Sequence, residues 1–134
     1  MMGALEALLA REACMRLCLD IAVLADARDA AGLAQLFTED GVFERLGQVF
    51  RGREAIRQAI AARPAEVWSR HYPANIRIDI ADDGRSANGS SYLLMFRGKA
   101  GVDGHELIHA EYLDEFALTA EGWRFSARKV SLRP

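Results

Sequence analysis

Apolar residues in the N-terminal part of the chain follow a helical spacing. Between residues 4 and 27 they recur every three or four positions, which predicts one long helix. Further apolar residues widen its apolar face, so we expect most of this helix to be covered. Asp29 suits the N-cap of a short second helix, and the polar run "TEDG" at residues 38–41 then breaks the helical pattern.

Short strands and one further helix are predicted after that break. Residues 41–52, "GVFERLGQVFRG", are typical of a strand pair or of one bent strand with Gly47 at the corner. Residues 53–62 return to helical spacing. This helix should end before Pro64, because the residue that precedes a proline disfavours the helical conformation.

The C-terminal half predicts two long hairpins. In residues 71–98 isoleucines alternate with polar residues, and an Asp-Asp-Gly turn separates two strands. Residues 105–132 form a second hairpin that turns at residues 120–122. Helices followed by a mostly antiparallel sheet indicate an α+β fold with the helices on one face of the sheet. Such a curved sheet makes a cone, with a cavity between helices and sheet that suits a small ligand.

Composition narrows the class of protein. The 134 residues correspond to a single domain, 1–134, and 51% hydrophobic with 27% charged residues is an ordinary globular composition. The net charge of −2, without blocks of like charge, argues against nucleic acid or a membrane surface as a partner. Apolar runs fall short of the roughly 20 residues of a membrane helix, and the N-terminus lacks the pattern of a signal peptide. We therefore expect a cytoplasmic protein.

The two cysteines, Cys14 and Cys18, lie four apart and so share one face of the first helix. One interpretation is a redox pair or half of a metal site. We favour two small buried side chains, because no second cysteine pair or nearby histidine completes a ligand set. We accordingly expect neither a metal nor a cofactor.

Four segments of the chain carry a resemblance to a known family: "LADARDAAGLAQLFTEDGVFE", "RHYPANIRI", "GRSANGSSYLLMF" and "AEYLDEFALTAEGWRFSARKV". They resemble the SnoaL-like and ketosteroid-isomerase-like proteins of the NTF2-like superfamily. They are especially similar to the branch related to scytalone dehydratase and to the β subunits of ring-hydroxylating dioxygenases. The resemblance covers nearly the whole chain. It implies a cone-shaped α+β barrel with an apolar pocket for a ring-shaped substrate. Such proteins are often homodimers, and we expect this one to dimerise through its sheet.

His71 and Asp26 are the first candidate site residues. By the resemblance, His71 matches the catalytic histidine of the dehydratase, and Asp26 matches the aspartate that supports it. Imidazole titrates near neutral pH, so it can take a proton and return it. The structural alternative is that His71 merely begins a strand and that Asp26 merely ends the first helix.

Arg45 departs from the family pattern. It stands where the ketosteroid isomerases keep a catalytic aspartate and where the dehydratase keeps a pocket tyrosine. Arginine cannot act as a base, but its forked donors can bind a carboxylate, an enolate or a phenolate. A shift of one residue would place Glu44 there instead, and strand alternation allows only one of the two to face the pocket.

Asp114 and Arg128 form the third candidate group. If residues 120–122 make a three-residue turn, Thr119 pairs with Trp123 and Asp114 lies opposite Arg128. The matching positions of SnoaL-like cyclases hold a catalytic histidine and aspartate, so that pair is not reproduced. A cross-strand ion pair is the structural alternative. The expected pocket walls are Phe43, Tyr72, Tyr92, Tyr112 and Phe116.

These residues predict a cofactor-independent dehydratase or isomerase for a small apolar cyclic substrate. His71 would exchange protons, Asp26 would orient it, and Arg45 would bind an oxyanion or carboxylate. One alternative is a non-catalytic binding or assembly subunit like the dioxygenase β subunits. Another is an epoxide hydrolase-like enzyme that uses Arg45, Asp26 and Asp114. In an enzyme His71, Asp26 and Arg45 should converge within hydrogen-bond or one-water reach inside a closed-ended cavity, whereas Phe, Met and Leu side chains should fill that space in an assembly subunit.

Overall fold

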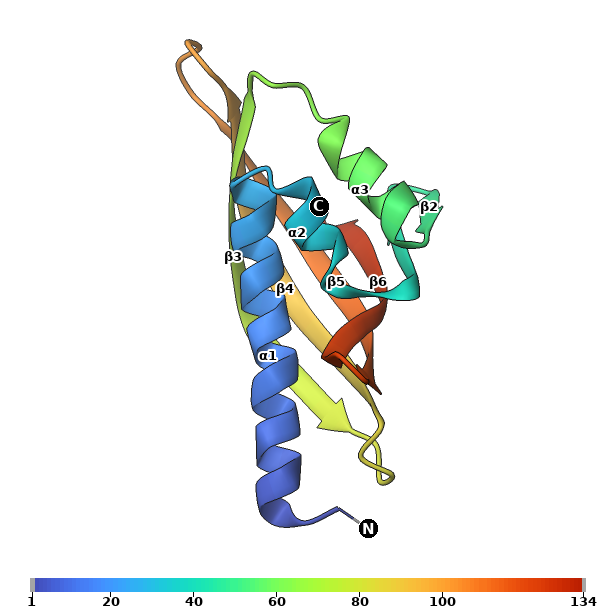
Figure 1. Cartoon of the computed structure of the whole chain (residues 1–134). Helices are drawn as coiled ribbons and strands as arrows, with labels where there is room; N and C mark the ends of the chain where they lie inside the picture. Colours follow the sequence, from blue (N-terminus) through green and yellow to red (C-terminus); the bar gives the residue numbers. More distant parts are fainter. Residues whose placement is uncertain (1, 134) are drawn as a thin grey trace.

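The computed structural model describes residues 2–133, as three helices on one side of a curved sheet of six strands (Figure 1). Helix α1 (Ala4–Asp26) runs beside the sheet, and α2 (Ala30–Ala34) and α3 (Arg53–Ala61) lie near its C-terminal end. The strands are β1 (Phe37–Arg45), β2 (Gln48–Arg51), β3 (Val67–Ile80), β4 (Ser86–Lys99), β5 (Glu106–Thr119) and β6 (Gly122–Arg133).

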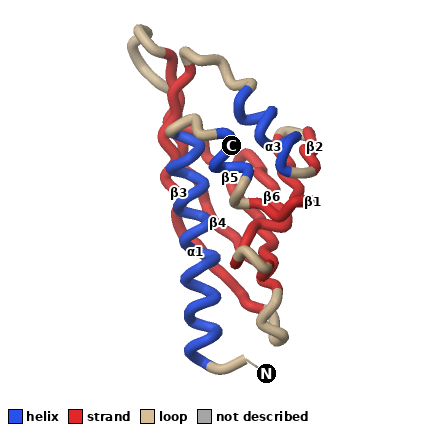
Figure 2. Tube along the Cα trace, viewed as in Figure 1, coloured by secondary structure: helices blue, strands red, loops and turns tan. Residues whose placement is uncertain are grey.

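The strands follow the order β2-β1-β6-β5-β4-β3 across the sheet (Figure 2). Neighbours run antiparallel except β1 and β6, which run parallel. The expected α+β architecture, with helices packed on a curved and mostly antiparallel sheet, is therefore confirmed. The sheet remains open, with β2 and β3 as its edges, so it does not close into a complete barrel.

Two local features predicted from the sequence are also confirmed, the cap of α2 and the turn between β1 and β2. The Asp29 carboxylate caps α2 by accepting a hydrogen bond from the backbone N–H of Gly32 at 2.9 Å. Strands β1 and β2 are joined by Leu46 and Gly47, which both have positive φ, 50° and 77°. Two consecutive positive φ angles are the requirement of the tightest hairpin turns, and glycine meets it without steric cost.

Aromatic rings form the centre of the core. Phe125 of β6 is fully buried between Phe37 of β1 and Phe116 of β5, with ring centroids 5.3 and 4.9 Å away. Helix α1 contributes one apolar face to this core, at Ala10, Cys14, Leu17, Cys18, Ile21 and Ala25.

Helix α1 is less covered than the sequence indicated. Leu5, Leu8 and Leu9 keep 69%, 56% and 59% of their exposure, and Leu19 and Val23 are exposed as well. The expectation of a mostly covered helix is wrong because the sheet packs against one side of α1 and no second layer covers the other. Despite these leucines, no helix within residues 2–133 is long and apolar enough to cross a membrane.

Strand β3 changes its inward-facing residues at a bulge. The isoleucines of residues 76–80 pack against the core. His71, nearer the start of the strand, faces the same side although it lies an odd number of positions from each of them. A regular strand cannot do this, because successive side chains face opposite sides. The pairing with β4 shifts register between Ala74 and Arg77, where Asn75 has a positive φ of 52°. The extra residue reverses the alternation and brings His71 inward.

The β5–β6 hairpin reaches the expected pairing by a different route. Thr119 pairs with Gly122, so the expected pairing of Thr119 with Trp123 is wrong by one residue. A bulge further along β6 then adds one residue and restores the register. Asp114 consequently lies opposite Arg128, as the sequence analysis predicted.

Truncation of Phe125 tests the aromatic core. We expect Phe125→Ala to lower the free energy of unfolding by about 3–5 kcal/mol, because neighbouring rings cannot fill the space that it leaves. Val102→Ala, in the loop after β4 and with 61% exposure, is the control and should change stability by roughly 0.5 kcal/mol or less. Urea denaturation measures both, and equal effects of the two variants would contradict this description of the core.

Candidate functional site

A cavity of about 680 Å³ lies between the helices and the inner face of the sheet. Its volume falls in the range of sites that hold small molecules. Apolar side chains from α1 and from strands β4 to β6, such as Ile21, Leu93 and Val130, form much of its wall. The polar part of the wall includes Arg45, Arg63, His71, Tyr112 and Arg128.

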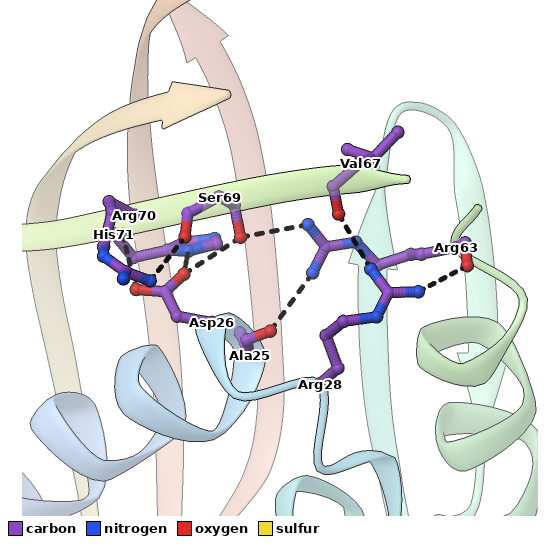
Figure 3. A network of polar contacts seen from close by, with 8 residues as sticks. All are labelled: Ala25, Asp26, Arg28, Arg63, Val67, Ser69, Arg70 and His71. Atoms are coloured by element: carbon purple, nitrogen blue, oxygen red, sulfur yellow. Dashed lines mark hydrogen bonds and ion pairs between the residues drawn. The ribbon is translucent and has the colours of Figure 1, made fainter. Parts of the chain in front are cut away.

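Asp26, the last residue of α1, joins that helix to β3 (Figure 3). Its carboxylate accepts hydrogen bonds from the backbone N–H of His71 at 2.9 Å, from the Ser69 hydroxyl at 2.9 Å and from His71 Nδ1 at 2.5 Å. The side chains of Asp26 and His71 keep 14% and 11% of their exposure, so the pair is largely shielded from water. The two residues that the resemblance linked are therefore in direct contact.

This contact determines the tautomer of His71. A carboxylate can only accept hydrogen bonds, so Nδ1 carries the proton and Nε2 keeps a lone pair in the neutral ring. Because His71 lines the cavity, Nε2 is the nitrogen available to a ligand. Burial lowers the pKa of His71, and the nearby Arg63 and Arg128 lower it further, which outweighs the raising effect of Asp26. The ring is therefore a neutral base at neutral pH.

Three residues that the sequence analysis did not single out support the pair (Figure 3). Arg63 donates a hydrogen bond to Ser69 Oγ at 3.1 Å, and Ser69 in turn donates to Asp26. Arg28 donates to the backbone oxygens of Val67 and Arg63 at 2.9 and 2.7 Å, which holds the start of β3 near the end of α1. Ser69 could have been found, since it lies two residues before His71 and so shares its strand face. For Arg28 and Arg63 no local pattern gives such a signal.

Arg45, rather than Glu44, lines the cavity. The Glu44 carboxylate lies on the other side of β1, 3.6 Å from Lys129 Nζ. The Arg45 guanidinium lies over the rings of Phe43 and Phe50, 5.5 and 5.8 Å from their centroids. The alternatives left open by the sequence are thus resolved in favour of Arg45, and Phe43 lines the cavity beside it as expected.

Arg128 and Asp114 form a buried ion pair across β5 and β6. Arg128 Nε and Nη2 donate to the two oxygens of Asp114 at 2.8 and 3.0 Å, and both residues keep 3% exposure. The guanidinium also stacks 3.6 Å from the centroid of Tyr112, and burial raises the pKa of this tyrosine. Arg128 and Tyr112 line the cavity, whereas Asp114 lies behind them. Asp114 therefore balances a charge in the wall without facing the cavity.

The remaining expected pocket residues lie elsewhere. Tyr72 and Tyr92 keep 55% and 56% exposure and are absent from the cavity lining, because their neighbours in the strands face inward. For Tyr72 the bulge in β3 is the cause, since it turns His71 inward and Tyr72 outward. Phe116 packs against Phe125 in the core rather than in the cavity.

Cys14 and Cys18 are buried, with 0% and 1% exposure, as expected of small core side chains. Burial raises the pKa of both thiols to about 12, so they stay protonated at neutral pH. Cys18 also lines the cavity, with its Sγ 3.9 Å from Asp114 Oδ2.

Comparison with known proteins identifies the relatives of this chain. The sequence model of the SnoaL-like domain matches residues 6–129. No match was found among curated proteins. The structure is similar to that of Rv3472 from Mycobacterium tuberculosis, a protein of unknown function, with 28% identity and a TM-score of 0.87. The match covers 98% of this chain and 77% of that protein.

Two further structures share the fold at lower identity. A proposed scytalone dehydratase from Novosphingobium aromaticivorans is 21% identical, with a TM-score of 0.88 over 98% of this chain and 89% of the other. The hexachlorocyclohexane dehydrochlorinase LinA-type3 from Novosphingobium barchaimii is 22% identical, with a TM-score of 0.88 over 98% and 92%. At these identities the likeness is one of fold.

Titration of His71 tests the electrostatics of the site. We expect it to titrate below the ordinary pKa of histidine, and to titrate lower still in Asp26→Asn, because the variant loses the carboxylate that favours the charged ring. Proton NMR measures the titration of the His71 ring in each variant. Ser69→Ala keeps the Asp26 charge and is the control. A rise in the pKa of His71 in Asp26→Asn would contradict this assignment.

Proposed function

Because the chain belongs to the SnoaL-like domain family, we propose that it is a cofactor-independent enzyme that removes a proton from carbon in a cyclic substrate and so drives an elimination or an isomerisation. The observation that carries the proposal is the His71–Asp26 pair in the wall of the cavity. A neutral histidine with a fixed tautomer and a buried carboxylate behind it is a general base ready for use.

The reaction begins when His71 Nε2 takes the proton from a carbon next to a carbonyl group. The electrons of the broken C–H bond form an enolate, and Asp26 stabilises the imidazolium that results. If a hydroxyl group lies on the next carbon, its C–O bond breaks, and His71 returns the proton so that water leaves and a C=C bond remains. Without such a leaving group, His71 returns the proton to another carbon, and the product is an isomer. On a chlorinated ring without a carbonyl group, the electrons of the C–H bond form the C=C bond directly while the neighbouring C–Cl bond breaks, chloride leaves, and the proton stays on His71.

The names of the structural neighbours support elimination chemistry on this fold. A dehydratase removes water, and a dehydrochlorinase removes hydrogen chloride, so both names describe the loss of a proton and a leaving group. Of the three residues expected to converge, His71 and Asp26 are in contact, whereas Arg45 lines the same cavity and, among the described residues, bonds to neither. The open space of the cavity supports an enzyme over an assembly subunit, since Phe, Met and Leu side chains do not fill it. An epoxide hydrolase arrangement has less support, because Asp26 is bonded to His71 and Asp114 to Arg128 rather than gathered around Arg45.

We further propose that the protein forms a homodimer through the sheet. The face of the sheet away from the helices exposes apolar and aromatic side chains, among them Tyr72, Tyr92, Leu94 and Leu113. Tyr72 and Leu94 lie opposite each other on β3 and β4, and apolar side chains left exposed together on a sheet face are typical of protein interfaces.

Replacement of His71 tests the proposed reaction. The probes are scytalone, hexachlorocyclohexane and a panel of cyclic hydroxyketones, incubated in deuterated water and followed by mass spectrometry. Loss of water or chloride, or uptake of deuterium at carbon, reports proton removal. We expect His71→Gln to lower kcat by roughly 10²- to 10⁴-fold, the usual contribution of a general base. His109→Gln, on the exposed side of β5, is the matched control and should keep full activity.

The pH profile supplies a second readout of the same reaction. The base must be neutral, so kcat/KM should rise with pH along a limb whose midpoint lies below the ordinary pKa of histidine, and then level off. A His71→Gln variant with wild-type turnover and an unchanged profile would refute the proposed role of His71.

A further inference from the structure

The wall of the cavity carries an excess of positive charge. Within residues 2–133 its lining has one acidic side chain, Glu106, against five cationic ones: Arg45, Arg63, Arg97, Lys99 and Arg128. The whole chain has a formal net charge of −2, so this excess is local to the cavity. Cavities lined by one sign of charge draw in ligands of the opposite sign.

Protein groups already balance part of this charge. Arg128 is neutralised by Asp114, which it contacts through two parallel hydrogen bonds. Arg97 forms an ion pair with Glu106 at 3.3 Å. Arg63 donates to the neutral oxygens of Ala25 and Ser69, and the nearby carboxylate of Asp26 offsets part of its charge.

Arg45 differs from the other arginines of the lining. Among the described residues, no side chain or backbone group forms a hydrogen bond or ion pair with its guanidinium, which rests on the rings of Phe43 and Phe50. Burial lowers the pKa of Arg45. The pKa of Arg63 is lowered mainly by its own burial, and the charge of Arg45 is the next largest cause. The two guanidinium groups are therefore near enough to repel each other. An arginine stays charged at ordinary pH, so a ligand anion would relieve both the repulsion and the missing acceptor.

The surroundings favour a carboxylate over a phosphate. Helices α1, α2 and α3 contribute to the lining through residues of their C-terminal halves: Ala22, Ala25, Leu33 and Ile60. Phosphate sites commonly use the free N–H groups of helix N-termini, and these lining residues supply none. The planar fork of arginine matches a carboxylate, and the apolar remainder of the cavity suits a ring. A phenol is neutral at neutral pH and would leave the charge of Arg45 unanswered.

We propose that the substrate is a cyclic carboxylic acid whose permanent carboxylate binds Arg45, at a position remote from the carbon that reacts. This inference rests on the proposed function and names the substrate class of that site. Arg45 lies on β1 and His71 on β3, four strand spacings apart in the sheet. At roughly 4.8 Å per spacing the path along the sheet is about 19 Å, and both side chains reach inward across it. The substrate therefore bridges the two walls, with its carboxylate at Arg45 and its acidic C–H bond at His71.

The test compares two probes of equal shape and different charge. 2-Naphthoate carries a carboxylate on a fused ring, and 2-naphthalenemethanol replaces it with a neutral hydroxymethyl group. Isothermal titration calorimetry measures their binding to the wild-type protein, to Arg45→Gln and to Arg51→Gln. Arg51 is exposed on β2 outside the cavity, so this variant removes the same charge without touching the site. We expect the wild-type protein to prefer naphthoate by roughly tenfold to a hundredfold, the usual effect of a charged hydrogen-bonded pair.

The outcomes separate this inference from the proposed reaction. Loss of the preference for naphthoate in Arg45→Gln, with the preference kept in Arg51→Gln, supports the assignment. An equal preference in Arg45→Gln and the wild-type protein, no preference in the wild-type protein, or no saturable binding of naphthoate up to its solubility limit would each overturn it. Binding of naphthoate to His71→Gln isolates recognition from chemistry. If Arg45 fails this test while His71 proves essential for turnover, the substrate class alone is refuted.

Discussion

The hydrogen bonds that the Asp26 carboxylate accepts from β3 connect helix α1, the sheet and the wall of the cavity. They fix the end of α1 to the start of β3, across 45 positions of the sequence, and they orient the ring of His71. Burying a carboxylate costs free energy unless hydrogen bonds replace its water, and here backbone, hydroxyl and imidazole donors do so. One side chain thus serves both the packing of helix on sheet and the chemistry of the cavity, so these two roles cannot be varied independently.

The cavity and the aromatic core divide the space between helices and sheet. Near the core, aromatic side chains of β1, β5 and β6 meet α1 closely. Around the cavity, the inward side chains of β4 and β5 include Leu93 and Ala110, which do not fill the space. Arg128 also lines the cavity, and Asp114, which does not line it, balances its charge. The ion pair offsets part of the cost of burying the Arg128 charge, because both oxygens of the Asp114 carboxylate accept hydrogen bonds from the guanidinium.

How much of this could be predicted from the sequence depends on the kind of signal. The helices, the hairpins and the pairing of His71 with Asp26 follow from periodicity and from the family resemblance. Side-chain direction is harder, because a single extra residue reverses it. Alternation counted back from the isoleucines of β3 would turn Tyr72 inward and His71 outward, and Asn75 reverses that result. Arg63 was missed for another reason: its contact with Ala25 joins segments 38 positions apart, and its contact with Ser69 depends on the path of the irregular segment that precedes β3.

The parallel pairing of β1 with β6 has a consequence for the synthesis of the protein. Phe43 of β1 is aligned with Arg128 of β6, so the strand that carries Arg45 has no neighbour on that side until β6 has left the ribosome. The α1–β3 contact and the β3–β4 hairpin need far less of the chain. Because contacts between distant segments form slowly, His71 can be in place while the opposite wall is still missing. The cavity is thus completed by β6, which is made after the other five strands of the sheet, and a nascent chain that stalls before β6 exposes its apolar interior.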